Sequence, residues 1–299
     1  MSRWIVAAWL LLATARPGAA QGHPLEPILL RLAGGTRALG MANENVGGRD
    51  DDVIFYNAAQ LASARGTSVS NEWFTRANFL TTVSTSLPFA SGGLGLGAQS
   101  LTYSSAAGAP GDPRSLGGHG TQPASGLVLL AGYAQRLLGT RIGIVTKLVT
   151  DESGTYRDTR GAFDIGVARD VWQGTAGLAL QNLGEAVRTP SGRIPIPTRA
   201  TLGYQGGGLP VGPLDLVASA AVTMTRGRWV SGGLGAELAY GWLDGYTVSV
   251  RGGARRPADD GEGRWTAGLG FTADRVTVDY ALETRRGGQD AQRLGLRVR

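Results

Sequence analysis

The stretch RWTAGLGFTA, residues 264–273, decides the fold that this sequence predicts. Apolar side chains occupy every second position, and threonine or glycine occupies the positions between them. Side chains of a β-strand alternate between the two faces of a sheet, so this stretch places an apolar face opposite a small, polar face. The same alternation recurs along most of the chain after residue 65, where helical periodicity is nearly absent.

We count about fourteen such segments. Each is close to the ~9–11 residues that a tilted transmembrane strand needs. An even number of strands returns the last one to the side of the membrane where the first began. The segments are centred near residues 71, 82, 98, 131, 145, 165, 178, 202, 219, 234, 249, 268, 279 and 295.

The connections between these segments mostly alternate in length. Long, polar or Gly/Pro-rich links are expected at 104–124, 151–160, 184–197, 255–263 and 286–291, and tight turns at 138–140, 171–173, 241–244 and 274–275. The link at 226–228 is the exception, because it is short where a long one is due. Outer-membrane barrels pair long extracellular loops with short periplasmic turns in this way. The sequence therefore predicts an all-β, 14-stranded antiparallel transmembrane β-barrel.

A soluble β-sandwich has the same side-chain period and is the alternative. Its polar face would carry many Lys and Glu residues, whereas here that face is mostly Gly, Ser, Thr and Ala, which suit the crowded lumen of a closed barrel. Only a closed barrel also pairs every strand N–H and C=O in lipid. Aromatic residues near the expected strand ends are typical of an interfacial girdle: Trp172, Tyr204, Tyr240, Trp242 and Tyr246.

The first twenty residues are expected to be a cleaved signal peptide. Arg3 precedes an apolar run over 4–13 that is too short to span a bilayer, and a small-residue site follows at 18–20. Export without any cysteine removes disulfides and thiolate chemistry. The formal charge of +6 is spread along the chain without a basic run, so no nucleic-acid partner is expected. We divide the chain into signal peptide 1–20, plug segment 21–65 and barrel 66–299.

The plug segment contains the only helix-like stretches, around 37–46 and 55–63, with an acidic run at 50–52 between them. Carboxylates at short spacing suit Ca²⁺, but the Asp-x-Asp-x-Asp-Gly spacing of a calcium loop is absent. We expect either a solvated cluster at a helix start or pairing with lumenal arginines instead, with no metal site and no cofactor. Enzymatic activity is not expected either, because the two histidines, His23 and His119, do not form a positioned base with a nucleophile.

Charged residues also fall on the lumen-facing phase of the strands. One interpretation is a structural network that holds the plug to the wall, with each charge paired. The other is a lining that selects what passes. The residues are Arg141, Lys147, Asp164, Glu237, Arg251, Asp279, Arg293 and Arg297.

The stretch LALQNLGEAV, residues 178–187, combines a strand with a turn signal. Leu178 and Leu180 are expected to face lipid, and Ala179 and Gln181 the lumen. The motif Asn182, Leu183 and Gly184 is expected to mark the exit of the strand into an outer loop, because Asn and Gly both tolerate positive φ.

Several motifs carry a resemblance to a known family. GLALQNLG followed by IPIPTRATLGYQ resembles the signature of the PorV/PorQ family, a branch of the FadL-like outer-membrane barrels. GTRALGMANENVGGRDDDVIFYNAAQLA, residues 35–62, is similar to the family's N-terminal motif, and GIVTKLVTDESGTYRDTRGAFDIGV to a strand, loop and strand of it. The chain departs from the family at residues 58 and 42–43, where Ala replaces Pro and Ala-Asn replaces Gly-Gly.

The resemblance implies a plug folded into the barrel mouth and a location in the bacterial outer membrane. It implies a passive channel for hydrophobic or amphipathic small molecules, with an apolar pocket near Ile54, Phe55 and Leu61. The alternative is a type IX secretion shuttle or scaffold that binds exported proteins, especially through 104–124. Expected partners are outer-membrane lipid, the barrel-assembly machinery, and either a hydrophobic small molecule or a secreted protein. The plug motif residues are Arg37, Met41, Asp51, Asp52, Tyr56 and Asn57.

Overall fold

A computed structural model describes residues 27–75, 78–105, 122–153, 156–189, 192–194, 196–226, 230–257, 262–285 and 290–299. The expected signal peptide and most of the 104–124 link lie outside these residues. Among the residues that are described, no helix is both long and apolar enough to cross a membrane.

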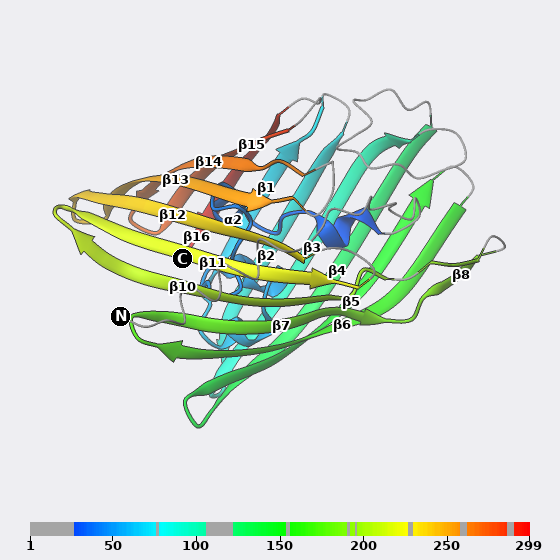
Figure 1. The fold of residues 1–299 in the computed structure, drawn as a ribbon, viewed down its shortest axis with the longest axis horizontal. Coiled ribbons are helices and arrows are strands. Elements are labelled where there is room, and N and C mark those ends of the chain that lie inside the picture. The colour runs from blue at the N-terminus through cyan, green and yellow to red at the C-terminus, as the bar shows by residue number, and fades with distance from the viewer. Residues whose placement is uncertain are drawn as a thin grey trace.

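Fourteen antiparallel strands close into one barrel, as the alternating pattern predicts (Figure 1). All fourteen expected centres fall within these strands. Each strand pairs with its neighbours in sequence, and β1 pairs with β16 to close the wall. The barrel strands are β1 Gly66–Trp73, β2 Phe79–Phe89, β3 Gly92–Ser105, β4 Gln122–Leu137, β5 Thr140–Ser153, β6 Tyr156–Val171, β7 Gly174–Gly184, β10 Arg199–Val211, β11 Leu214–Thr225, β12 Val230–Leu243, β13 Tyr246–Arg256, β14 Trp265–Ala273, β15 Val276–Thr284 and β16 Ala291–Val298.

Several strands are longer than the ~9–11 residues that the sequence pattern predicts. The strands β4 and β6, for example, each have 16 residues. The expected long link at 151–160 is therefore wrong: β5 and β6 continue through it as a paired hairpin. Cross-strand charges support this extension, since Arg157 Nε lies 3.1 Å from Glu152 Oε1. The polar residues between 151 and 160 therefore belong to paired strands that extend beyond the apolar belt, and not to a loop.

The tight turns and the long links lie at opposite ends of the barrel. Two-residue turns join β4 to β5, β6 to β7 and β14 to β15 at 138–139, 172–173 and 274–275. Their first residues have positive φ, as hairpin turns that match the strand twist require. The longer links join the opposite ends of the strands, as between β3 and β4 at 106–121 and between β13 and β14 at 257–264.

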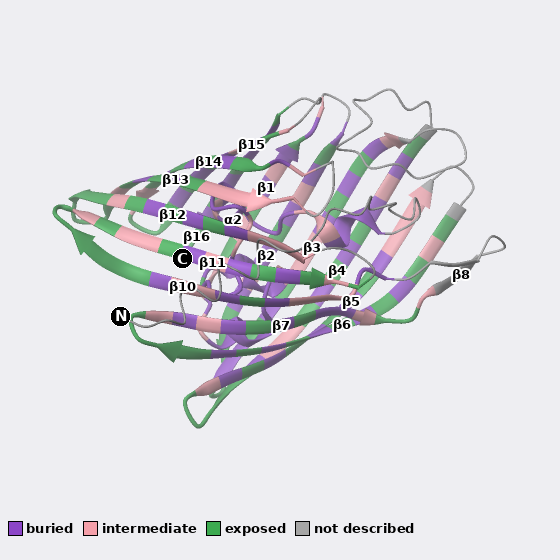
Figure 2. Ribbon diagram, in the orientation of Figure 1, coloured by how far each residue is buried: buried purple, intermediate pink, exposed green. Residues whose placement is uncertain are grey.

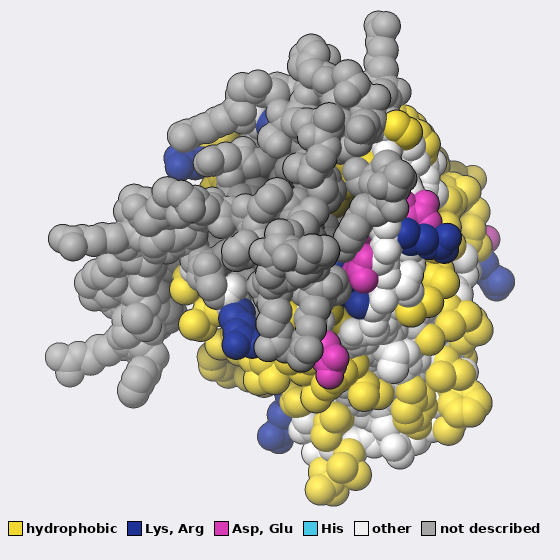
Figure 3. Space-filling view, turned by 90° about the vertical axis from the view of Figure 1, so that its right-hand side faces the viewer, with side chains coloured by type: hydrophobic (Ala, Val, Ile, Leu, Met, Phe, Trp, Pro, Cys, Tyr) yellow, Lys and Arg dark blue, Asp and Glu magenta, His cyan; other side chains and the backbone are white. Residues whose placement is uncertain are grey.

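The two faces of the wall differ as predicted, and burial alternates along the strands (Figure 2). Leu178 and Leu180 point outward and are exposed, whereas Ala179 and Gln181 are buried in the lumen. Large apolar side chains are exposed on every strand of the barrel, and Figure 3 shows some of them, beside uncharged polar and charged patches, in the part that grey atoms leave visible. The outer surface of the barrel is therefore apolar around most of its circumference.

The strand β7 ends at Gly184, so the motif marks its exit as predicted, but Asn182 itself still lies within the strand. It has φ 58° and lies inside β7, where the pairing with β6 shifts register between Phe163 and Ile165. The residue therefore forms a β-bulge, and its tolerance of positive φ serves the bulge rather than a loop corner. The link that follows contains an unexpected hairpin, β8 Val187–Thr189 with β9 Gly192–Ile194.

The plug consists of four short helical turns inside the barrel. They are η1 Ile28–Arg31, α2 Thr36–Gly40, η2 Asp51–Phe55 and η3 Ala58–Ala62. The helical stretch expected over 37–46 ends at Gly40, because Ala42 and Asn43 both adopt φ 62°. The stretch expected over 55–63 is likewise shorter.

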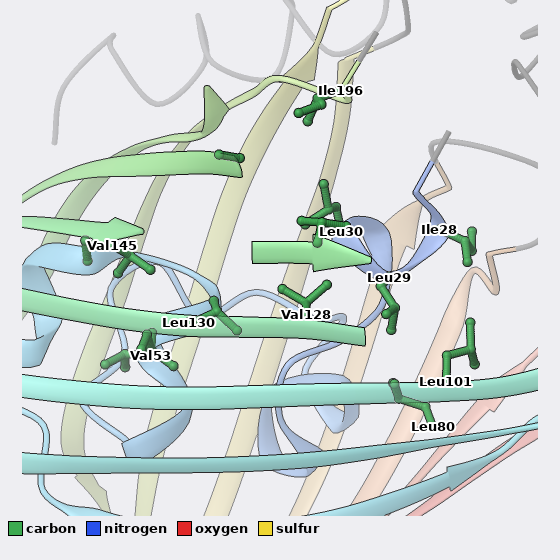
Figure 4. Close-up of a cluster of buried hydrophobic side chains, with 14 of the residues drawn as sticks. Ile28, Leu29, Leu30, Val53, Leu80, Leu101, Val128, Leu130, Val145 and Ile196 are labelled. Carbon is green, nitrogen blue, oxygen red and sulfur yellow. The ribbon is translucent and has the colours of Figure 1, made fainter. Parts of the chain in front are cut away.

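A buried apolar cluster joins the plug to one side of the wall (Figure 4). Leu29 and Leu30 of η1 and Val53 of η2 pack in this cluster with Val128 and Leu130 of β4. Burial of such side chains contributes about 1.5–3 kcal/mol each. The plug is therefore anchored on β2–β6 by apolar packing.

Candidate functional site

Lumen-facing glycines seat the plug on the wall. A Cβ at Gly143 would lie 2.4 Å from the carbonyl oxygen of Ala58, and one at Gly253 would lie 2.2 Å from the amide nitrogen of Ala42. No side chain fits at such separations, so only glycine lets the plug backbone approach the strands this closely. Comparable contacts occur at Gly93, Gly166, Gly177, Gly235 and Gly295.

These seats give a physical reason for much of the glycine content of the chain. Gly166 contacts Asn57, Gly177 contacts Val46, Gly235 contacts Met41, and Gly295 contacts Thr36. The contacts lie on strands all around the barrel, from β3 to β16. The small lumen-facing residues are thus a complementary surface for one particular plug.

Six charged side chains form a closed ring between plug and wall near the tight-turn end. Arginines and carboxylates alternate around the ring, and consecutive members are ion-paired. In order they are Arg37, Asp50, Arg297, Asp279, Arg251 and Glu237, which pairs with Arg37 again.

The plug contributes two members of this ring and the wall four. Arg37 Nη1 lies 2.8 Å from Asp50 Oδ2, and Arg37 Nη2 lies 2.8 Å from Glu237 Oε1. Arg297 Nη1 lies 2.6 Å from Asp50 Oδ1, and its Nη2 lies 2.7 Å from Asp279 Oδ2. Each charge has two partners of opposite sign, which offsets the cost of removing it from water.

Asp50 is the member that ties the plug to the last strand. Its Oδ1 also lies 2.6 Å from Nη2 of Arg299. Burial opposes its ionisation, but Arg37, Arg297 and Arg299 outweigh burial and hold the pKa of the Asp50 carboxyl far below its usual range. Asp50 is therefore a permanent anion.

The next two acids behave in the opposite way. Burial, together with the charges of Asp50 and Asp51, raises the pKa of Asp52 to about 8. Asn45 donates a hydrogen bond to Asp52 Oδ1 over 2.8 Å. Burial also raises the pKa of Asp51, whose Oδ2 accepts a bond from Ser84 Oγ at 3.2 Å. The acidic run thus combines an ionised Asp50 with two carboxyls whose pKa values are raised by burial.

Tyr56 and Asn57 hold the plug segments to one another. The Tyr56 hydroxyl accepts a hydrogen bond from the Gly34 amide at 2.9 Å and donates one to Asn43 Oδ1 at 2.5 Å. Asn57 caps η3 by accepting from the Ala59 amide at 3.1 Å. These two motif residues therefore have structural partners within the plug.

The remaining predicted lumen charges form separate groups. Arg293 is fully buried, donates to the carbonyl of Ala33 at 2.7 Å and pairs with Glu72 at 3.1 Å. Lys147 pairs with Asp164 at 2.8 Å.

Arg141 and the bulge residue Asn182 are tied to these groups and to the plug. Arg141 pairs with Asp170 at 2.7 Å and donates to Ser63 Oγ at 3.2 Å. Lys147 Nζ donates to Asn182 Oδ1 at 2.8 Å. Each of the eight predicted lumen charges thus has an opposite charge beside it among the described residues.

Two cavities lie on the two sides of the plug. The outer cavity, of about 70 Å³, is lined on one side by apolar residues such as Leu29, Phe55 and Val128. Its other side carries Arg199 and Glu44, and burial raises the pKa of Glu44 to about 7 against the opposing effect of Arg255 and Arg199.

The inner cavity is larger and polar. It has a volume of about 510 Å³, and the charged ring contributes Arg37, Asp50 and Arg251 to its lining. Arg49 and Asp170 form an ion pair of 2.6 Å at its edge. This cavity is therefore a charged vestibule at the tight-turn end.

The three residues expected near an apolar pocket have different surroundings. Phe55 lines the outer cavity. Ile54 and Leu61 are fully buried and pack against the seats at Gly95 and Gly97. Met41, from the plug motif, is buried over Gly235.

The sequence prediction included Asp50 only as part of the acidic run 50–52, and it omitted Arg299, which pairs with Asp50 from outside the ring. Both carried a usable signal in the sequence. Asp50 begins the acidic run, and Arg299 continues the odd-numbered phase of Arg293 and Arg297.

A closed 14-stranded barrel filled by an N-terminal plug defines the structural class of this chain. Solved structures share that architecture. The Pseudomonas putida toluene transporter TodX aligns with a TM-score of 0.56 and 11% identity over 89% of this chain and 97% of that one. The Ralstonia pickettii toluene transporter TbuX gives 0.55 and 11% over 89% and 98%.

A deltaS2 mutant of the TodX monoaromatic hydrocarbon channel aligns with a TM-score of 0.59 and 10% identity, over 88% of this chain and 97% of that one. The TM-scores, at such low sequence identity, establish a likeness of fold alone. No protein-family model and no curated protein matches the sequence.

Proposed function

We propose that this protein is a passive outer-membrane channel for hydrophobic or amphipathic small molecules, closed by its plug. The observation that carries the proposal is a lumen divided by the plug into two cavities, inside a wall whose outer face is apolar. The fold shared with TodX and TbuX, which are described as toluene transporters, supports the same class of cargo.

The outer face of the wall supports insertion in a bilayer. Leu202, Leu234 and Leu269 are each at least half exposed, and they lie on three different strands of the wall. A soluble protein rarely leaves such a continuous apolar surface in water. Aromatic side chains such as Trp242 and Trp265 are exposed near opposite ends of the wall, where the two bilayer interfaces are expected.

The outer cavity has the chemistry of an amphipathic ligand site. Leu29, Leu30 and Phe55 present an apolar surface, and Arg199 faces the same space. Most of the other lining residues are polar or charged, so a ligand with a small apolar part and a polar or anionic end would find partners for both parts. At about 70 Å³ the cavity is smaller than the ~150 Å³ that holds benzene in a protein core. The structure is thus a closed form, and cargo must displace part of the plug.

Uptake of the apolar dye N-phenylnaphthylamine by intact cells tests this function. Cells that express the protein should take up the dye faster than cells with an empty vector. Phe55→Asp should remove the gain, whereas Phe55→Leu should keep it, because leucine preserves the apolar lining. Dye uptake equal to the empty-vector rate, with the barrel present in the membrane, would overturn the proposal.

Binding of exported proteins is the alternative role. It predicts recovery of secreted proteins through the outer links, of which 106–121 lie outside the described residues. Pull-down from the native membrane separates the two roles. A secreted protein bound in stoichiometric amount, without dye uptake, would favour the scaffold.

A further inference from the structure

Residues 41–49, here called the strap, separate the two cavities. Ala42, Asn43 and Val46 line the outer cavity, and Gly47 and Arg49 line the inner vestibule. The strap rests on the wall formed by β7, β10, β12 and β13. Removing it from this wall would join the two spaces into one passage.

Both ends of the strap are fixed. Arg37, four residues before it, and Asp50, directly after it, pair with each other at 2.8 Å and belong to the charged ring. The ring fixes them to Glu237 and Arg297 of the wall. The strap is therefore a loop closed at its base, and it can move without releasing α2 or η2.

The strap lies outside the apolar clusters that anchor the rest of the plug, although Met41, Ala42 and Val46 are themselves buried against the wall. Within the described chain, none of its residues belongs to the buried apolar clusters, which instead contain residues of η1, η2 and η3. Ala42 and Asn43 both hold φ 62°, a conformation that costs energy for a residue other than glycine. Segments with few apolar contacts and local strain are the ones that open most easily.

Polar contacts hold the strap in the closed position. The Ala42 amide donates to Thr266 Oγ1 at 2.9 Å, and the Val46 carbonyl accepts from Asn57 Nδ2 at 3.0 Å. The side chain of Val46 lies over Gly177 and Gly203, which leave no room for anything larger. Such contacts can be exchanged for water when the strap lifts.

We propose that the strap is the gate of the channel: it lifts from β7, β10, β12 and β13 while α2 and η3 stay in place. The proposal rests on the channel function proposed above. It assigns the moving part to nine residues rather than to the whole plug.

Engineered disulfides test the gate directly, because the chain has no native cysteine. A Cβ at Gly203 would lie 3.3 Å from Cβ of Val46, close to the ~3.8 Å of a disulfide, so Val46→Cys with Gly203→Cys locks the strap. The matched control is Thr36→Cys with Gly295→Cys: the exchange of Thr36 removes the Oγ1 that lies 2.4 Å from the Cβ position of Gly295, the two Cβ atoms would lie 3.1 Å apart, and the lock holds α2.

The readout is the KCl conductance of single barrels in planar bilayers, which needs no knowledge of the cargo. Openings of the wild type should be lost in the oxidised strap lock and return on reduction, and they should persist in the oxidised α2 lock. A strap lock that conducts like the wild type would overturn the gate. Loss of conductance in both locks would also overturn it, because the whole plug would then have to move.

A second variant tests the gate in the case that the wild-type channel does not open without its cargo. Val46→Arg cannot seat over Gly177 and Gly203, so it should conduct even where the wild type is silent. Gel migration with and without heating confirms that the variant forms a barrel. A folded but silent Val46→Arg would refute the gate. If the conductance results agree with the gate but the cells take up no dye, the proposed class of cargo is wrong and the gate still holds.

Discussion

Asp50 and Asp52 are two residues apart, yet the pKa of Asp50 is lowered and that of Asp52 is raised, so at neutral pH Asp50 is ionised and Asp52 is protonated. Asp50 is surrounded by three arginines, which stabilise its anion. Asp52 is equally buried but accepts a hydrogen bond from the neutral side chain of Asn45. Placement relative to the ring, rather than residue type, decides which acid carries the charge.

Exchanging each acid for asparagine should separate these roles. Asp50→Asn leaves buried arginines short of a partner and should lower the free energy of unfolding by about 3 kcal/mol, since breaking a buried ion pair typically costs ~3–5 kcal/mol. Asp52→Asn mimics the protonated carboxyl and should change stability by less than about 1 kcal/mol at neutral pH. Urea unfolding in detergent micelles measures both. Equal losses in the two variants would refute the assigned charge states.

Asp52 should also make stability depend on pH. The folded protein keeps a proton on Asp52 up to about pH 8, whereas the unfolded chain releases it near the ordinary pKa of ~4. Folding therefore binds a proton between these values, so the contribution of Asp52 to the free energy of unfolding falls as pH rises through this window and levels off above it. Unfolding curves measured between acidic and mildly basic pH should show that Asp52→Asn removes this fall. An unchanged pH slope in the variant would contradict the buried, protonated carboxyl.

At the scale of elements, the fit between η3 and the wall depends on glycine. A Cβ at Gly143 would meet the Ala58 carbonyl oxygen at 2.4 Å. Because the Cβ position is fixed by the backbone and the carbonyl oxygen belongs to the backbone, the clash can be relieved only by moving η3 away from β5. The outward-facing Gly252 has nothing within 4 Å of the same position. The two sites form a matched pair on one barrel.

Gly143→Ala should destabilise the protein by about 1–3 kcal/mol, the usual cost of overpacking. Gly252→Ala should stay within about 0.5 kcal/mol of the wild type, because it meets only solvent or lipid. Limited proteolysis of the plug, alongside urea unfolding, distinguishes plug release from loss of the barrel. A tolerated Gly143→Ala would show that the seat is not close-packed.

The strands were predictable and the path of the plug was not. Alternation such as that in Trp265–Ala273 comes from the environment of the wall itself, so it is visible in the sequence. The bulge at Asn182 and the extended β5–β6 hairpin depend on partners such as Lys147 and Arg157 that pairing brings together. Likewise, the ring pairs residues up to 247 positions apart in the sequence, so only the closed barrel shows which wall arginine pairs with Asp50.

At the scale of the whole molecule, the account depends on the apolar outer face lying in lipid. Leu269 lies in the middle of β14, and Leu243 ends β12 beside a tight turn. Both side chains are more than half exposed. Their depth in a bilayer should therefore differ although their exposure does not.

Leu269→Arg should lower the free energy of unfolding in lipid vesicles by about 2–4 kcal/mol, because the penalty for arginine peaks at the bilayer midplane. Leu243→Arg should lower it by only about 0–1 kcal/mol. Denaturant titration in vesicles measures both values. Equal effects of the two substitutions would argue against a membrane belt at this level.

Native mass spectrometry of the protein extracted from its own membrane, followed by identification of any co-purifying molecule, tests the central claim most directly. The account predicts a bound apolar or amphipathic small molecule that is lost in Phe55→Asp and kept in Phe55→Leu. A stoichiometric exported protein with no small molecule would contradict the channel and establish a role in secretion.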